Sequence, residues 1–236
     1  MVETAHPPPP LTSAPPIVDE AGRQLRAPWA AGVAGLLFAA LFTAALVLMR
    51  GQALVTASDA EIKEIFAAGG EIGALIGGLY LAPFAGIMFL WFIAVVRDQV
   101  GDREDRFFAT VFLGSGLIFV SMLFAAAAVA SAPLVGVRYL GQAPPTATEM
   151  EGARALSYTL LFAFGTRAAA VFLLATATVG IRSAAIPRWC AWAGYLLGVA
   201  LLVAVAFWDW VVLVLPVWVA LVSLFILRTE RARRSA

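Results

Sequence analysis

Charged residues are scarce in this chain of 236 residues. Asp, Glu, Lys and Arg together make up 13% of the sequence, whereas soluble domains carry about 25%. Apolar residues make up 62% even without glycine, against roughly 45 to 50% in soluble domains with glycine counted. These proportions exclude a water-soluble globular domain and predict an integral membrane protein.

The basic and acidic side chains nearly balance. The 16 Lys and Arg residues and the 15 Asp and Glu residues give a formal net charge of +1. Because nucleic acids are bound through concentrated positive charge, the sequence predicts no nucleic-acid partner.

Histidine and cysteine occur once each, as His6 and Cys190. Histidine-based zinc sites, haem sites and Ser–His catalysis need a histidine within the folded region, and His6 precedes all the apolar segments. We therefore predict no metal site, no cofactor and no catalytic residue, so that the protein is not an enzyme. Cys190 has no second thiol with which to form a disulfide within the chain, and we expect it to be a small apolar filler.

Long uncharged runs predict the membrane-spanning helices, because about 20 apolar residues cross the hydrocarbon core of a bilayer. The last apolar run, 189–227, is too long for one crossing, so we expect a turn at Asp209, between Trp208 and Trp210. The fold class expected is all-α, a polytopic membrane protein with six spans, at Trp29–Met49, Ile72–Val96, Phe107–Val137, Ala155–Ile181, Trp189–Phe207 and Val211–Leu227.

The basic residues predict the orientation, because Lys and Arg in short loops are retained on the cytoplasmic side. We expect a multi-pass protein of the cytoplasmic (inner) membrane with both termini cytoplasmic. The loops then assigned to the outside carry only Arg50, Lys63, Arg138 and Arg154, whereas the inner segments carry Arg23, Arg26, Arg97, Arg103, Arg106, Arg182, Arg188, Arg228, Arg231, Arg233 and Arg234.

Three regions are expected along the chain. Residues 1–28 are rich in proline, with a run from Pro7 to Pro10, and predict a disordered cytoplasmic tail. Residues 29–227 form the six-helix transmembrane domain, and residues 228–236 form a basic cytoplasmic tail. The first span is expected to remain as a membrane anchor rather than to be removed as a signal peptide.

Two segments, 51–59 and 141–149, resemble each other at an offset of 90 residues. One interpretation is a tandem repeat of a two-helix hairpin, followed by a terminal helical hairpin. The alternative is that both segments use common helix-start chemistry. In either case, two capping boxes predict two helix starts, because a hydroxyl residue is followed three residues later by a glutamate. They are Ser58 with Glu61, and Thr148 with Glu151. We expect the first helix to lie on the interface and to end at Gly69 and Gly70.

Small residues and prolines within the spans indicate how the helices pack. Gly73 with Gly77, and Gly194 with Gly198, have the spacing that lets two helix backbones approach closely. Pro83 and Pro216 are expected to kink the second and sixth spans. Trp218 falls near the middle of the sixth span and is expected to fill the bundle.

Arg167 is the one charged residue within an apolar span, about 18 Å from Ala155 and about 21 Å from Ile181 along a helix. An arginine at this depth costs about 2.5 to 3.5 kcal/mol on insertion scales. One interpretation is that its guanidinium bonds carbonyls and hydroxyls such as Ser115 or Ser121, or reaches the outer interface. The other is that it faces a cavity for an anionic ligand.

Two segments carry a resemblance to a known group of proteins. Residues 60–66 leading into Gly73–Gly77, and residues 186–194 around Trp189 and Trp192, resemble bacterial six-span membrane proteins of unknown function. The resemblance implies a six-span fold and a bacterial source, and it implies no activity and no site residues.

These observations lead to two functional hypotheses. The first is a non-enzymatic accessory or regulatory membrane component, whose partners are the lipid bilayer and either a second copy of the chain or another membrane protein. The second is a small transporter or a lipid- or anion-binding membrane protein in which Arg167 binds the anionic ligand or lipid.

Overall fold

The structure, a computed structural model, describes residues 28–50, 57–100, 106–183, 187–203 and 210–235. Residues 1–27 of the predicted proline-rich tail, which include His6, and the predicted turn at Asp209 lie outside these residues. Within them every regular element is helical and no strand occurs. The elements are α2 (Pro28–Arg50), α3 (Asp59–Ala67), α4 (Ile72–Ile76), the π-helix η2 (Gly77–Leu81), α5 (Ala82–Val100), α6 (Arg106–Leu140), α7 (Ala147–Tyr158), the π-helix η4 (Thr159–Gly165), α8 (Thr166–Ser183), α9 (Arg188–Val203), the 3₁₀-helix η5 (Val211–Leu213) and α10 (Val214–Ser235).

Among the described residues, five helical stretches are long and apolar enough to cross a membrane: Trp29–Arg50, Ile72–Arg97, Thr110–Leu140, Ala147–Arg182 and Val211–Thr229. The all-helical class is therefore confirmed for the described residues, and the apolar helices fit a multi-pass membrane protein. The predicted crossing at Trp189–Phe207 corresponds to α9, a shorter apolar helix of 16 residues, which is about 24 Å long. Helix α10 continues through the basic segment that follows Leu227 and ends at Ser235.

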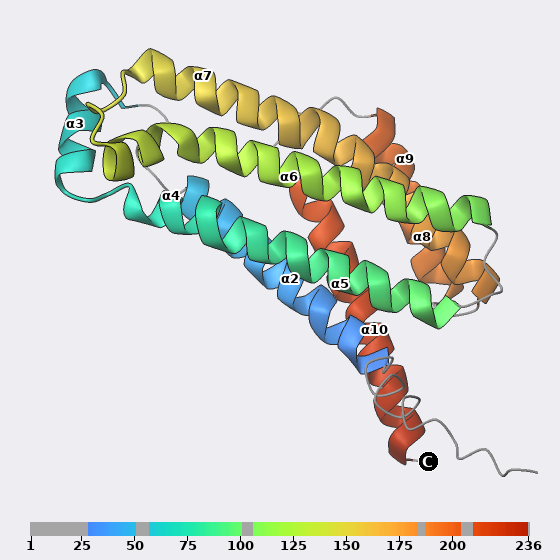
Figure 1. Cartoon of the computed structure of the whole chain (residues 1–236). Coiled ribbons are helices and arrows are strands. Elements are labelled where there is room, and N and C mark those ends of the chain that lie inside the picture. The colour runs from blue at the N-terminus through green and yellow to red at the C-terminus, as the bar shows by residue number, and fades with distance from the viewer. Residues whose placement is uncertain (1–27, 51–56, 101–105, 184–186, 204–209, 236) are drawn as a thin grey trace, which may run out of the picture.

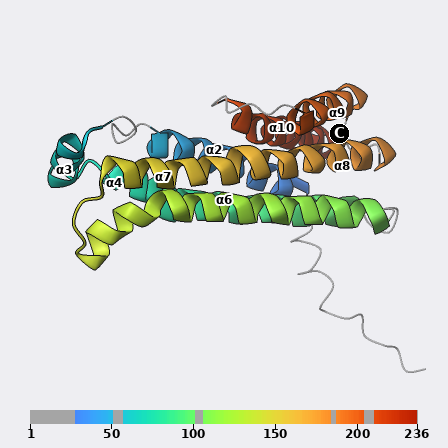
Figure 2. The ribbon, with the colours of Figure 1, turned by 90° about the horizontal axis from the view of Figure 1, so that it is seen from above.

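The helices form an elongated bundle (Figure 1). Helix α2 packs between α5 and α10, α8 packs between α6 and α9, and α5 contacts α6. Gly32 and Gly35 near the start of α2 contact Leu227 and Ser223 in the middle of α10, and the last turns of α10 continue beyond this contact. The first residues of α2 and the last residues of α10 therefore lie at the same end of the bundle, and α3 lies at the opposite end (Figures 1 and 2).

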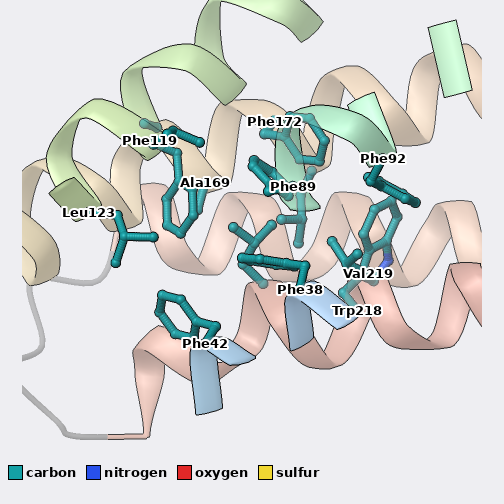
Figure 3. Close-up of a cluster of buried hydrophobic side chains, with 14 of the residues drawn as sticks. Phe38, Phe42, Phe89, Phe92, Phe119, Leu123, Ala169, Phe172, Trp218 and Val219 are labelled. Atoms are coloured by element: carbon teal, nitrogen blue, oxygen red, sulfur yellow. The ribbon is translucent and has the colours of Figure 1, made fainter. Parts of the chain in front are cut away.

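Phenylalanine rings from four helices fill the centre of the bundle (Figure 3). The ring of Phe89 lies 4.6 Å from that of Phe38, 5.3 Å from that of Phe119 and 4.9 Å from that of Phe172, measured between centroids. Lipid competes for apolar surface, so dispersion and aromatic packing rather than hydrophobic burial hold such helices together. Trp218 is 1% exposed, as predicted for a residue that fills the bundle.

Several glycines lie where one helix approaches another. A Cβ at Gly77 would lie 3.0 Å from the carbonyl oxygen of Ala45 and 3.0 Å from Met49 on α2. A Cβ at Gly198 would lie 2.9 Å from Leu174 of α8, and one at Gly194 would lie 3.2 Å from Trp218 of α10. These contacts are all within the chain. The fourth glycine of the two predicted pairs is Gly73, which is half-buried.

Two serines are seated against glycines of neighbouring helices. The hydroxyl of Ser223 on α10 lies against Gly35 of α2, and that of Ser131 on α6 lies against Gly78 of η2, so closely that an added Cβ would overlap each hydroxyl. Both hydroxyl oxygens are buried, and no hydrogen-bond partner for either is present in the described part of the chain. The absence of a side chain at Gly78 therefore sets how closely η2 approaches α6.

The first capping box is as predicted. The backbone N–H of Ser58 donates to Glu61 Oε2 at 2.7 Å, and the N–H of Glu61 donates to the Ser58 hydroxyl. The backbone donor, followed by the Ser58 hydroxyl, holds the pKa of the Glu61 carboxyl below its ordinary value. Helix α3 ends at Ala67, before Gly69, whose φ of 71° suits glycine.

The second capping box uses Thr146 and Glu149, so the prediction of Thr148 and Glu151 was wrong. Both threonines have a glutamate three residues later, and the pattern alone does not distinguish them. The carboxylate of Asp59 accepts a hydrogen bond from the N–H of Ala147 at 2.7 Å, which places the N-terminus of α7 beside that of α3. The two caps are therefore related by 88 residues rather than by the 90 of the sequence alignment.

The backbone changes helix type just before each proline that was expected to kink a span. Pro83 is the second residue of α5 and follows the π-helix η2, and Pro216 is the third residue of α10 and follows the 3₁₀-helix η5. A proline in the first turn of an α-helix removes an N–H that has no intrahelical acceptor in a regular helix start. Each proline thus marks where a span resumes α-helical geometry.

Candidate functional site

Helices α2, α6, α7 and the π-helix η4 line a partly open cavity of about 130 Å³ toward the α3 end of the bundle. Its lining is mainly apolar. The large apolar side chains include Phe42, Leu46, Leu123, Leu161 and Phe162. Alanines contribute much of the rest, at positions 45, 74, 82, 126, 127, 130 and 153, and their small side chains leave the space open.

Polar groups also line this cavity. Arg50 is the last residue of α2, Ser131 lies on α6, and Glu151 and Arg154 lie one turn apart on α7. On α2, Phe42 lies eight residues, or about 12 Å, before Arg50, and on α6 Leu123 lies the same distance before Ser131. On these two helices Arg50 and Ser131 therefore lie nearer the α3 end than Phe42 and Leu123. The apolar residues Met49 and Leu134 line the cavity at the same end.

Aromatic rings hold the two arginines. Tyr158 and Phe162 lie one turn apart, with ring centroids 4.8 Å apart in a stacked arrangement. The guanidinium carbon of Arg50 lies 5.8 Å from the Tyr158 centroid and 5.2 Å from that of Phe162. That of Arg154 lies 5.9 Å from the Tyr158 centroid. These are cation–π distances, and the negative ring faces favour the positive charges.

One hydrogen bond sets α7 against α6. The hydroxyl of Ser157 donates to the carbonyl oxygen of Ala126 at 2.9 Å. The helices run in opposite directions, so the residues that precede Ser157, among them Arg154 and Glu151, lie beside residues that follow Ala126, toward Ser131. Because Gly77 contacts Met49 and Gly78 contacts Ser131, the end of α2 is at a similar level. The polar lining residues are thus gathered at one end of the cavity.

Arg167 is not among the residues that line this cavity. It is half-buried at the start of α8, and its Nη1 donates to the carbonyl oxygen of Ala163 at 2.6 Å within the same span. The hydroxyls of Ser115 and Ser121 each donate to carbonyl oxygens of their own helix. Of the hydrogen-bond partners that the sequence suggested for Arg167, a backbone carbonyl is therefore the one found in the structure.

Glu71 is a buried acidic residue. It is 2% exposed, it precedes α4, and no hydrogen-bond partner of its Oε2 is found among the described residues. No group of three or more potential metal ligands occurs in the described part of the chain. Cys190 is buried, as expected of a small apolar filler.

The sequence alone missed the cavity arginines as site residues, because Arg50 and Arg154 follow or precede apolar runs and were assigned to outer loops. A usable signal was present on α7 and η4, where Arg154, Tyr158 and Phe162 repeat at intervals of four residues and so share a helix face. The position of Arg50 above that face depends on how α2 packs, and no sequence pattern indicates it.

Comparisons of the chain with protein-family models, with curated proteins and with solved structures give no match. The resemblance to bacterial six-span proteins therefore stays a prediction. The function has to be argued from the geometry of the cavity.

Proposed function

We propose that this protein binds an anionic amphiphile of the membrane in the cavity between α2, α6 and α7, and that it does so without catalysing a reaction. The observation that carries the proposal is the presence of two guanidinium groups over stacked aromatic rings in a cavity whose remaining lining is mainly apolar. A polar head group suits the first feature and a hydrocarbon segment suits the second.

The chemistry of arginine supports an anionic head group. A guanidinium carries five N–H donors in a planar fork, which matches the oxygens of a carboxylate or a phosphate. Arg50 and Arg154 replace Arg167 as the residues proposed to bind this anion, since they line a cavity and Arg167 does not.

The protein is further proposed to cross the cytoplasmic membrane six times, with both termini in the cytoplasm. The excess of arginine in the predicted inner segments supports this orientation. The position of the start of α2 beside the end of α10 also supports it. The adjacent capping boxes of α3 and α7 support the repeated hairpin. In this arrangement the cavity lies toward the outer leaflet.

A second candidate function is an accessory membrane component that binds another copy of the chain or another membrane protein. It is favoured by one exposed face of α9, where large apolar residues recur at helical spacing: Trp189, Trp192, Leu196, Val199 and Val203. Helix α9 packs mainly on α8, which leaves this face available.

The purified full-length protein tests the first proposal through the lipid that it retains. The variant Arg50→Gln/Arg154→Gln removes both cavity charges, and Arg167→Gln is the matched control, since it removes an arginine outside the cavity. Loss of charge-assisted hydrogen bonds worth about 1.5 to 3 kcal/mol each predicts at least tenfold weaker binding of anionic lipid in the double variant. Native mass spectrometry in mild detergent measures it.

Two results would contradict the proposals. If the double variant keeps the same anionic lipid as the wild type, or if Arg167→Gln loses as much, the cavity is not the binding site. The same spectra report how many copies of the chain associate, and a protein that is always monomeric and without a protein partner would argue against the accessory function.

A further inference from the structure

The helical stretch formed by α7, η4 and α8 is continuous from Ala147 to Arg182, but its middle is a π-helix. In η4 each backbone hydrogen bond encloses one residue more than in an α-helix, and π-helical turns of this kind are frequent at functional sites. One residue corresponds to about 100° of rotation about the axis of an α-helix. The π-helix therefore determines which side of α7 faces the cavity when α8 is packed in the bundle.

The cavity depends on this rotation, because Tyr158 is the last residue before η4. The Tyr158 ring lies within cation–π distance of both cavity arginines, Arg50 on α2 and Arg154 on α7. Two residues of η4 itself, Leu161 and Phe162, line the cavity. A regular α-helix over the seven residues of η4 would turn Tyr158 by about 100° relative to α8, and so take its ring away from Arg50.

The hydroxyl of Thr166 supports the π-helix at its C-terminal end. The backbone N–H of Thr166 donates to the carbonyl oxygen of Leu161, five residues earlier. In an α-helix that N–H would donate to Phe162, so the π-helix leaves the Phe162 carbonyl oxygen without its usual donor. The Thr166 hydroxyl donates to this oxygen. Thr166 is 4% exposed, so solvent has little access to replace the hydroxyl.

A second threonine shows what distinguishes this hydrogen bond. The hydroxyl of Thr176 also donates to a carbonyl oxygen four residues earlier, that of Phe172, and Thr176 is equally buried. Thr176 lies inside α8, where the backbone N–H of the same residue pairs with that carbonyl oxygen. The Thr176 hydroxyl is therefore a second donor, whereas the Thr166 hydroxyl takes the place of the first. Loss of the Thr166 hydroxyl is the more costly, because it leaves a buried carbonyl unpaired.

We infer that Thr166 is a positioning residue of the proposed binding site, because its hydroxyl stabilises the π-helix η4 and so holds Tyr158 against the Arg50 guanidinium. The inference rests on the proposed function and adds to it a residue that does not line the cavity. Without the hydroxyl, α-helical geometry becomes favoured in residues 159–165, because it pairs the Phe162 carbonyl with a backbone N–H.

Binding of dioleoyl phosphatidylglycerol to the full-length protein in mild detergent tests the effect on the site. Thr166→Val removes the hydroxyl and keeps the shape of the side chain, Thr166→Ser keeps the hydroxyl, and Thr176→Val is the matched control. We expect Thr166→Val to weaken binding by about tenfold or more, because Arg50 loses its place over the ring. Thr166→Ser and Thr176→Val should bind as the wild type does. Equal binding by Thr166→Val and Thr176→Val would overturn the inference.

A second measurement detects the rotation of α7 without a ligand. The Ser157 hydroxyl donates to the Ala126 carbonyl of α6, and a turned α7 would already have lost this bond. In the Thr166→Val background, Ser157→Ala should therefore lower the midpoint of thermal unfolding less than it does in the wild type. In the Thr176→Val background it should lower the midpoint as much as in the wild type, since distant residues act additively. Additivity in both backgrounds contradicts the inference.

The outcomes separate the inference from the proposed function. If Arg50→Gln/Arg154→Gln weakens binding of dioleoyl phosphatidylglycerol and Thr166→Val does not, the proposed function stands and the inference is wrong. If binding does not depend on the two arginines, the proposed function is wrong, and Thr166 then positions no binding site. Should Thr166→Val fail to fold, Thr166→Ala replaces it in both measurements, with Thr176→Ala as its control.

Discussion

Arginine suits its place in the cavity better than lysine would. Its guanidinium is planar and weakly hydrated, so it can lie flat over a ring and still donate in its own plane. Arg50 lies over two rings at once, those of Tyr158 and Phe162. An ammonium group holds its water more strongly and has no flat face. The aromatic pair therefore stabilises the positive charge of Arg50 beside apolar side chains.

The close contact between Gly78 and Ser131 leads to a testable prediction, because the Ser131 hydroxyl occupies the space that a side chain at position 78 would need. Gly78→Ala forces η2 and α6 apart and should destabilise the protein by about 1 to 3 kcal/mol. Gly114→Ala is the control, since no atom lies within 4 Å of its added Cβ, and it should be neutral or stabilise by up to about 1 kcal/mol. Thermal unfolding in detergent measures both.

A double variant identifies the cause. Removing the hydroxyl in Gly78→Ala/Ser131→Ala leaves the added Cβ with ordinary contacts to the Ser131 Cβ at 3.4 Å and the Ala127 carbonyl at 3.5 Å. We expect most of the lost stability to return. If Gly78→Ala is as stable as Gly114→Ala, or if the double variant is as unstable as the single one, the contact with Ser131 does not set the helix separation.

At the scale of the element, the sequence predicted helices more reliably than their exact starts. Length and hydropathy located α2, α5, α6, α8 and α10, because a bilayer requires uninterrupted apolar residues whatever the packing. The start of α7 was misplaced by two residues, since Thr146 and Thr148 both begin a capping-box pattern. The contact that distinguishes them is the bond from Ala147 to Asp59, 88 residues away, and a local pattern cannot contain it.

The threonine pair gives a prediction about α7. Thr146→Ala removes the hydroxyl that accepts the N–H of Glu149, so it should destabilise the start of α7 by about 0.5 to 2 kcal/mol. Thr148→Ala lies two residues further, within the helix, and should change stability little. Amide hydrogen exchange of residues 147–152 measures the effect. Faster exchange in Thr148→Ala than in Thr146→Ala would indicate that Thr148, as the sequence predicted, is the N-cap residue of α7.

At the scale of the whole molecule, the cavity depends on which helices are neighbours. Its alanines come from α2, α4, α5, α6 and α7, and in the sequence each is an ordinary small residue of an apolar helix. They produce a space only because the bundle places them together. For the same reason the sequence predicted Arg167 as the unusual charge. The bundle instead brings together two other arginines at the cavity, Arg50 at the end of α2 and Arg154 two turns into α7.

The bundle also predicts which parts of the protein are accessible from each side of the membrane. Glu64 on α3 and Ala232 near the end of α10 are both exposed, and they lie at opposite ends of the bundle (Figure 1). In a Cys190→Ala background, Glu64→Cys should react with a membrane-impermeant maleimide on intact cells. Ala232→Cys should react only after permeabilisation, because the arginine distribution places that end in the cytoplasm. The reverse pattern would invert the orientation. Labelling of both on intact cells would mean that the bundle does not cross the bilayer along its long axis, and the cavity would then not face the outer leaflet.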